Sequence, residues 1–240
     1  MGRAFEVRKK AMAQTNAAKT KLYAKFGKEL ILAAKAGVPD PEMNVALRRT
    51  IEKAKRAQIP ADVIKRAIDK AKSGVTENYV PVTYEGFGPG ASTLIVECLT
   101  DNVNRAISEV RNCFTKSKSK LGVAGAVSHN YDHVAIFTFK GLSEDQVLEA
   151  CVNANVDIKS LEASEGIITV VSDPKDQYAT KTALESLKKD IVFDDEEVTY
   201  VPQNGEYVTL SGEDLDYFNR LLEMLEAVDD VQEVYHNVNI

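Results

Sequence analysis

The sequence predicts an α+β multidomain protein, with an N-terminal three-helix domain followed by two α/β domains. The third domain is expected to be ferredoxin-like (βαββαβ) and inserted into the second. Three observations predict this class. Hydrophobic periodicity changes from helical to alternating near Tyr79, and residues 134–200 follow a complete β-α-β-β-α-β order. A chain of 240 residues with 44% hydrophobic content can also bury one sizeable core or two to three small ones.

Residues 17–73 show helical periodicity in three segments, separated by Gly37-Val38-Pro39 and Ile59-Pro60. Each segment has an apolar stripe, and lysines and arginines recur on the other faces. We therefore expect a small helical bundle with a cationic exterior. Residues 1–16 contain few core-sized side chains, so we expect a basic arm or a marginal helix without a partner.

From Tyr79 the pattern is that of strands. Segments 80–84 and 94–98 alternate in hydrophobicity and flank the glycine-rich segment 86–90, which indicates a hairpin. A helix is expected over about 102–114, with Asp101 or Asn102 as its N-cap.

The inserted domain is expected to begin with a strand at 134–139 and a helix opened by the capping box Ser143 to Gln146. A second helix is opened by Asp173-Pro174. A final helix after Ser211 and a strand at 231–238 have no neighbouring element in the sequence with which to form a domain. We therefore expect them to return to the sheet begun at 79–131. The predicted division is a basic arm at 1–16, a helical domain at 17–75, an α/β domain at 76–132 plus 203–240, and an inserted domain at 133–202.

Charge is distributed unevenly along the chain. The first 74 residues carry 18 Lys+Arg against 7 Asp+Glu, whereas the remaining 166 carry 12 against 29. A basic segment tethered to an acidic body is the arrangement expected when one end of a molecule binds a polyanion. The sequence therefore predicts nucleic-acid binding.

The candidate contact residues are cations of the arm at 1–16, selected cations of the first two helical segments, and a second cluster at 105–120. They are Arg3, Arg8, Lys9, Lys10, Lys19, Lys21, Lys25, Lys28, Arg49, Lys53, Arg56, Arg105, Arg111, Lys116, Lys118 and Lys120. In the run from 116 to 120 the lysines alternate with Ser117 and Ser119. This pattern favours a flexible loop that contacts phosphates without reading bases. Tryptophan is absent, so stacking platforms are not evident and we expect backbone-dominated binding.

The sequence does not indicate an enzyme, a cofactor or a metal site. It contains no GxSxG or HExxH motif, and a strand rather than a helix follows the glycine-rich turn. His129, Asp132 and His133 have a spacing that would suit a metal on a helix, but their context is that of strand and turn. The acidic runs 194–197 and 229–230 are interpreted as solvated turns.

The cysteines Cys98, Cys113 and Cys151 lie far apart among apolar neighbours, so we expect small buried hydrophobic residues. No apolar stretch approaches the length of a membrane span, and the N-terminus lacks a signal-peptide pattern. We expect a cytoplasmic protein without a membrane partner.

Several motifs together resemble the YebC/PmpR family, and most closely its YeeN-like branch. They are Met1-Gly2-Arg3, Pro39 to Asn44, Tyr84 to Gly90, Leu99 to Arg105, Gly125 to Ser128 and Asp230 to Asn237. The resemblance implies three domains and a DNA-binding transcriptional regulator. It also implies an alternative, a ribosome-associated translational activator that binds ribosomal RNA. From their charge, the acidic domains are expected to contact the ribosome or another protein. A ligand-sensing or protein-interaction module stays open as a third hypothesis, because ferredoxin-like domains host many functions.

Overall fold

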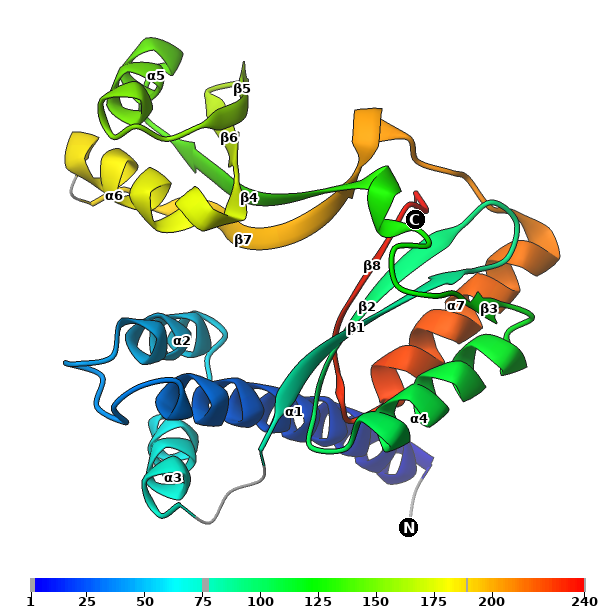
Figure 1. The fold of residues 1–240 in the computed structure, drawn as a ribbon. Coiled ribbons are helices and arrows are strands. Elements are labelled where there is room, and N and C mark those ends of the chain that lie inside the picture. The colour runs from blue at the N-terminus through cyan, green and yellow to red at the C-terminus, as the bar shows by residue number, and fades with distance from the viewer. Residues whose placement is uncertain (1–2, 75–77, 189, 240) are drawn as a thin grey trace.

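A computed structural model describes residues 3–74, 78–188 and 190–239, with side chains from Ala18 onward. This part of the chain contains seven α-helices and two four-stranded antiparallel sheets, arranged as three units (Figure 1). The predicted α+β multidomain class is confirmed. We refer to the units as the helical bundle, the central unit and the distal unit.

The helical bundle consists of α1 (Arg3–Lys35), α2 (Val45–Arg56) and α3 (Ala61–Lys72). The helices end where the sequence predicts, and Leu30, Leu47 and Ala54 are fully buried between them. Asn44 fixes the corner between α1 and α2, since its side chain accepts the Leu47 amide proton at 3.0 Å and donates to the Ala33 carbonyl at 2.8 Å. The backbone of α1 is helical from Arg3 and continues without a break through residue 17.

The central unit is built on β1 (Val80–Phe87), β2 (Thr93–Thr100), β3 (Lys120–Leu121) and β8 (Val231–His236), in the order β3-β1-β2-β8. Helices α4 (Val103–Lys116) and α7 (Gly212–Ala227) cover one face, with Phe114 and Phe218 in the core between them. The final helix and strand therefore return to the first sheet, as predicted.

The glycine-rich segment is a hairpin turn, as predicted. Gly90 has a φ of +60°, a region that glycine adopts readily. Gly86 lets α4 pack closely, because a Cβ at this position would lie 2.3 Å from the Phe114 ring. Packing and turn geometry thus account for these glycines.

The distal unit contains β4 (Tyr131–Lys140), α5 (Glu144–Asn153), β5 (Ile158–Ser164), β6 (Ile167–Ser172), α6 (Gln177–Leu187) and β7 (Phe193–Pro202). Its strand order, β5-β6-β4-β7, is that of a ferredoxin-like sheet. The predicted capping box opens α5, with reciprocal hydrogen bonds between Ser143 and Gln146. The acidic run 194–197 lies within β7, so its interpretation as a turn was wrong.

A two-stranded ribbon joins the distal unit to the central unit (Figure 1). Residues 131–134 of β4 pair only with residues 199–202 of β7, and β6 joins the sheet from Ala135 onward. At the base of the ribbon, Tyr131 is buried beside Ile95, and the rings of Tyr200 and Tyr235 meet at 5.1 Å. The anchor therefore reaches Tyr200, which stands opposite His133, and only the pair Val134–Thr199 lies between it and the three-stranded part of the sheet.

The three cysteines are buried, as predicted. Within the described ranges, no helix combines the length and apolar character needed to cross a bilayer.

Candidate nucleic-acid interface

The predicted contact residues are divided among distinct surfaces. Arg3, Arg8, Lys9 and Lys10 lie on the helical backbone of α1, and their side chains fall outside the described part of the structure. Lys19 is exposed on the same helix. The other cations face the central unit, the distal unit or solvent, and these three settings differ in what surrounds the charge.

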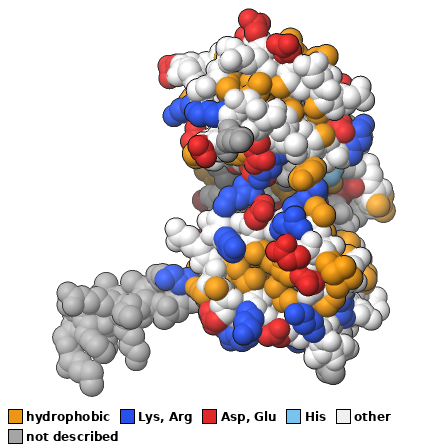
Figure 2. All heavy atoms as spheres, turned by 90° about the vertical axis from the view of Figure 1, so that its left-hand side faces the viewer, with side chains coloured by type: hydrophobic (Ala, Val, Ile, Leu, Met, Phe, Trp, Pro, Cys, Tyr) orange, Lys and Arg blue, Asp and Glu red, His pale blue; other side chains and the backbone are white. Residues whose placement is uncertain are grey.

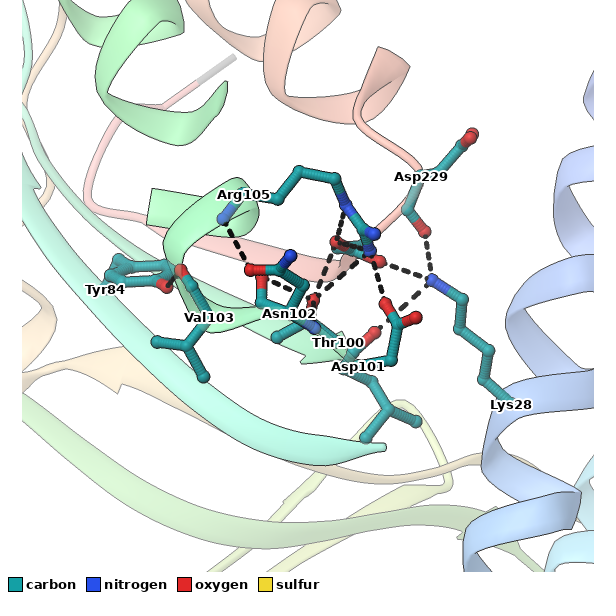
Figure 3. A network of polar contacts seen from close by, with 10 residues as sticks. Lys28, Tyr84, Thr100, Asp101, Asn102, Val103, Arg105 and Asp229 are labelled. Atoms are coloured by element: carbon teal, nitrogen blue, oxygen red, sulfur yellow. Dashed lines mark hydrogen bonds and ion pairs between the residues drawn. The ribbon is translucent and has the colours of Figure 1, made fainter. Parts of the chain in front are cut away.

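Lys21, Lys25 and Lys28 recur on the face of α1 that packs against the central unit. Lys28 Nζ lies 2.7 Å from Asp230 Oδ1 and also donates to the Asp229 carbonyl at 3.0 Å (Figure 3). Lys25 contacts Glu233 and the Gln232 carbonyl. Burial lowers the pKa of Lys21, and the carboxylates of Glu226 and Asp229 oppose that shift. The expectation that these lysines form a cationic exterior was therefore wrong.

Asp230 is the centre of this contact, and only 1% of it is exposed. Besides Lys28, its carboxylate accepts hydrogen bonds from Thr100 Oγ1 at 2.8 Å and from Arg105 Nη2 at 2.7 Å. Burial acts to raise the pKa of Asp230, but the hydrogen bonds from Lys28, Arg105 and Thr100 outweigh it and the pKa is lowered. The interpretation of residues 229–230 as a solvated turn was wrong for Asp230.

Local sequence explains why Arg105 reaches this carboxylate. Asn102 is the N-cap of α4, and its side chain accepts the Arg105 amide proton at 3.1 Å. This cap places Arg105 in the first turn of α4, beside the turn between α7 and β8. Arg105 Nη2 also lies 2.6 Å from Asp101, so its charge is shared between two carboxylates of this chain (Figure 3).

Arg49, Lys53 and Arg56 line a cleft of about 1010 Å³ at which all three units meet. Arg56 pairs with Glu196 of β7, and the Arg49 guanidinium lies 4.1 Å from the centre of the Tyr178 ring of α6. Lys53 is 3.3 Å from Glu29 within the bundle. Figure 2 shows lysine, arginine and acidic side chains side by side where the bundle below meets the distal unit above.

The strands that line the cleft contribute several acidic side chains. These side chains include Glu97 of β2, Glu233 of β8, and Asp195 and Glu197 of β7. Burial raises the pKa of Glu197, and the negative charges of Asp195 and Glu233 raise it further. The lining of the cleft thus mixes both charges, because Glu29 and Glu52 lie on the bundle side and Lys181 lies among the acids of the distal unit, and the carboxylates would repel a nucleic acid.

Arg111, Lys116 and Lys120 are exposed on α4 and β3 and make no ion pair with any described residue. Lys118 is also exposed, but it lies 4.1 Å from the centre of the Tyr217 ring and 3.7 Å from Glu213. We call these four residues the α4–β3 edge. All four side chains are exposed to solvent.

The α4–β3 connection is an ordered turn and not the flexible loop that the alternating serines suggest. The amides of Ser117 and Ser119 both donate to the Phe114 carbonyl, at 3.1 and 2.9 Å. Lys118 has a φ of +51°, and Lys120 pairs with Phe87 of β1. The cations of this edge are therefore held on a fixed backbone, which reduces the entropy lost when they bind a ligand.

Sequence reasoning did not select Lys55, Lys65 and Lys72, three exposed cations of α2 and α3 without an ion pair in the described part of the chain. The signal was present, since all three lie off the apolar stripes of their helices. It also missed Asp230, because nothing local marks an acid that pairs with residues more than a hundred positions away.

The fold and the distribution of charge define an α+β protein of three units. Acidic residues of the two sheet units contact a basic helical bundle, and three of the four cations of the α4–β3 edge make no ion pair with any described residue. Residues 3–74 match the family described as "TACO1/YebC protein N-terminal domain", and residues 79–238 match "TACO1/YebC second and third domain". The chain belongs to the TACO1/YebC family.

Relatives of known sequence cover the whole chain. A protein of Pseudoalteromonas atlantica named "Probable transcriptional regulatory protein" is 53% identical over 99% of this chain and 97% of its own length. A Vibrio cholerae protein with the same description is 49% identical over the full length of both chains. The crystal structure of a conserved hypothetical protein from Aquifex aeolicus matches with a TM-score of 0.72 and 33% identity, over 95% of this chain and 93% of that one. The names of the relatives support a regulatory role.

Proposed function

We propose that this protein regulates gene expression by binding the phosphate backbone of nucleic acid, and that it acts by binding and not by catalysis. The binding surface is the α4–β3 edge together with the basic N-terminal turns of α1. Duplex DNA is the first target to test, because curated relatives are named probable transcriptional regulatory proteins.

The observation that carries this proposal is that three of the four cations of the α4–β3 edge, Arg111, Lys116 and Lys120, make no ion pair with any described residue. All three are exposed, so a phosphate can bind them without breaking an ion pair to the described part of the chain. Lys25, Lys28 and Arg105 would first have to leave carboxylates of this chain. Free cations are therefore the stronger candidates for contacts that fix a protein on a backbone without reading sequence.

Fluorescence anisotropy with a labelled mixed-sequence duplex, and with an RNA hairpin of equal length, tests the proposal. Binding to a duplex should weaken with salt, with a log-log slope of about −0.9 for each phosphate neutralised. Reversing Arg111, Lys116 and Lys120 to Glu should weaken binding about tenfold or more and reduce the slope by about 2 to 3. Tighter binding of the RNA hairpin would identify RNA as the target.

A matched control reverses Lys140, Lys159 and Lys188 of the distal unit, which gives the same change in net charge. These lysines are exposed and lie outside the α4–β3 edge. Equal losses of affinity in both triple variants would show that net charge alone matters and would count against the edge as the binding surface.

A further inference from the structure

The basic face of α2 is covered in part by the distal unit. Arg49 and Arg56 are seven positions apart and lie on one side of the helix, with Lys53 between them. Arg56 pairs with Glu196, and Arg49 stacks over Tyr178 at 4.1 Å. These two contacts bring β7 and α6 against α2, although the chain segments are more than a hundred residues apart.

The Arg56–Glu196 and Arg49–Tyr178 contacts can separate with a small loss of free energy. Glu196 also accepts hydrogen bonds from Lys181 of its own unit, at 3.0 and 3.1 Å, so it keeps a cationic partner when Arg56 leaves. Half of the Arg56 side chain is exposed already, and Tyr178 is 55% exposed. Neither separation therefore leaves a buried charge unpaired, which is the situation that makes ion pairs costly to break.

The fold also provides a place for movement. The distal unit is held by the ribbon formed by residues 131–134 and 199–202, which lacks a third strand. Two-stranded ribbons twist more than wider sheets do. Tyr131 and Tyr200 of the ribbon are anchored on the central unit, Tyr200 through the ring of Tyr235. The pair Val134–Thr199 is left between this anchor and the three-stranded part of the sheet, so bending there would carry α6 and the rest of β7 away from α2.

We propose that β7 and α6 form an autoinhibitory latch on a second nucleic-acid-binding surface, the α2 face made by Arg49, Lys53 and Arg56. Glu196 occupies the position that a backbone phosphate takes when the distal unit swings away on its ribbon. This inference rests on the proposed function, because it assumes that nucleic acid is the ligand. The acidic residues of β7 beside Glu196 repel a polyanion in the closed state, and this repulsion disfavours binding until the latch opens.

Two variants open the latch by different means. Glu196→Gln removes the charge that faces Arg56, and Tyr178→Ala removes the ring under Arg49 without a change of charge. Glu149→Gln and Tyr207→Ala are the matched controls, since both residues are exposed away from the cleft lining. We expect binding of the labelled duplex to tighten about threefold in each latch variant and about tenfold in the double variant, with no change in the controls.

The movement is measured in the same proteins with spin labels at Lys55→Cys on α2 and Thr182→Cys on α6, two exposed positions. The native cysteines are buried and compete little for the label. Electron-electron double resonance should give one short distance in the free protein and a longer one with saturating duplex. The double latch variant should populate the longer distance without duplex.

The outcomes separate the two proposals. Binding that the edge reversal weakens, with latch variants equal to their controls and an unchanged distance, overturns the latch and leaves the proposed function standing. Tighter binding without a longer distance between the spin labels also overturns the latch. In that case Glu196 would weaken binding only by electrostatic repulsion, without any movement of the distal unit. No binding by any of these proteins at low salt overturns the proposed function, and the latch falls with it.

Discussion

Two surfaces of the molecule are rich in cations: the inner face of α1, formed by Lys21, Lys25 and Lys28, and the α4–β3 edge. They differ in what surrounds the charge. Lys25 and Lys28 of α1 meet Glu233 and Asp230, whereas Lys116 and Lys120 meet solvent. In the sequence the two clusters carry the same signal. The excess of basic residues in the first 74 positions and of acidic residues after them is therefore explained in part by ion pairs between the two parts of the chain.

The two surfaces therefore have different physical roles. On α1 the lysines place the bundle on the central unit, because their partners belong to β8 and to the turn before it. At the α4–β3 edge the fixed cations produce a positive potential toward solvent, which attracts polyanions. If this comparison is correct, substitutions on the inner face should change stability, and substitutions at the edge should change binding.

The largest expected effect is that of Asp230→Ala. This substitution removes the acceptor shared by Lys28, Arg105 and Thr100 and leaves their donors facing one another. We expect the free energy of unfolding to fall by about 2–3 kcal/mol, less than for a fully buried pair because Arg105 is partly exposed. Urea denaturation followed by circular dichroism measures this loss.

Asp229→Ala is the neighbouring control, since Asp229 contacts Lys28 through its backbone carbonyl and its side chain is exposed. Its effect should stay within about 0.5 kcal/mol. Equal losses in the two variants would show that the turn, and not the buried carboxylate, supports the interface.

The second expected effect is a dependence of this stability on pH. The pKa of Asp230 is lowered in the folded protein, so its stabilising contribution is complete above the unfolded value of about 3.9 and disappears as the pH falls through the folded value. The difference in unfolding free energy between the wild type and Asp230→Asn should be constant from about pH 7 to pH 5 and narrow below about pH 4. A difference that stays constant in acid would show that the charge of Asp230 contributes nothing.

Regular local patterns were enough to predict most of the elements, but not the short strand β3 or the acidic first half of β7. The switch from helical to alternating periodicity, the Ser143 capping box and the breaks around Pro39 and Pro60 all correspond to observed boundaries. The return of β8 to the first sheet was also predictable, because a helix and strand after a complete ferredoxin-like order need a partner elsewhere. The predicted domain boundaries and contact residues stay predictions.

The roles of the charged residues were not predictable in the same way. Lys28 and Asp230 are about 200 positions apart, and their pairing depends on how α1 packs against the central unit. A run of acids such as 194–197 reads as solvated whether it forms a turn or the strand that faces α2. Periodicity reports which side of an element is polar, but it does not report which other element covers that side.

The smallest expected effects test the comparison within a pair of matched variants, Lys28→Met and Lys116→Met. Both substitutions remove one positive charge and keep an unbranched side chain of similar length. Lys28 is 14% exposed and donates to three acceptors, so its loss should lower the unfolding free energy by about 1 kcal/mol and leave duplex affinity unchanged. Lys116 has no acidic partner among the described residues, so its loss should change stability by less than about 0.5 kcal/mol and weaken duplex binding about two- to threefold. The informative result is that one variant loses stability but not affinity, while the other loses affinity but not stability. Each variant therefore serves as the control for the other. If Lys28→Met weakened duplex binding as much as Lys116→Met did, α1 would have to separate from the central unit during binding. The distinction between lysines that hold the bundle on the central unit and lysines that bind nucleic acid would then be wrong.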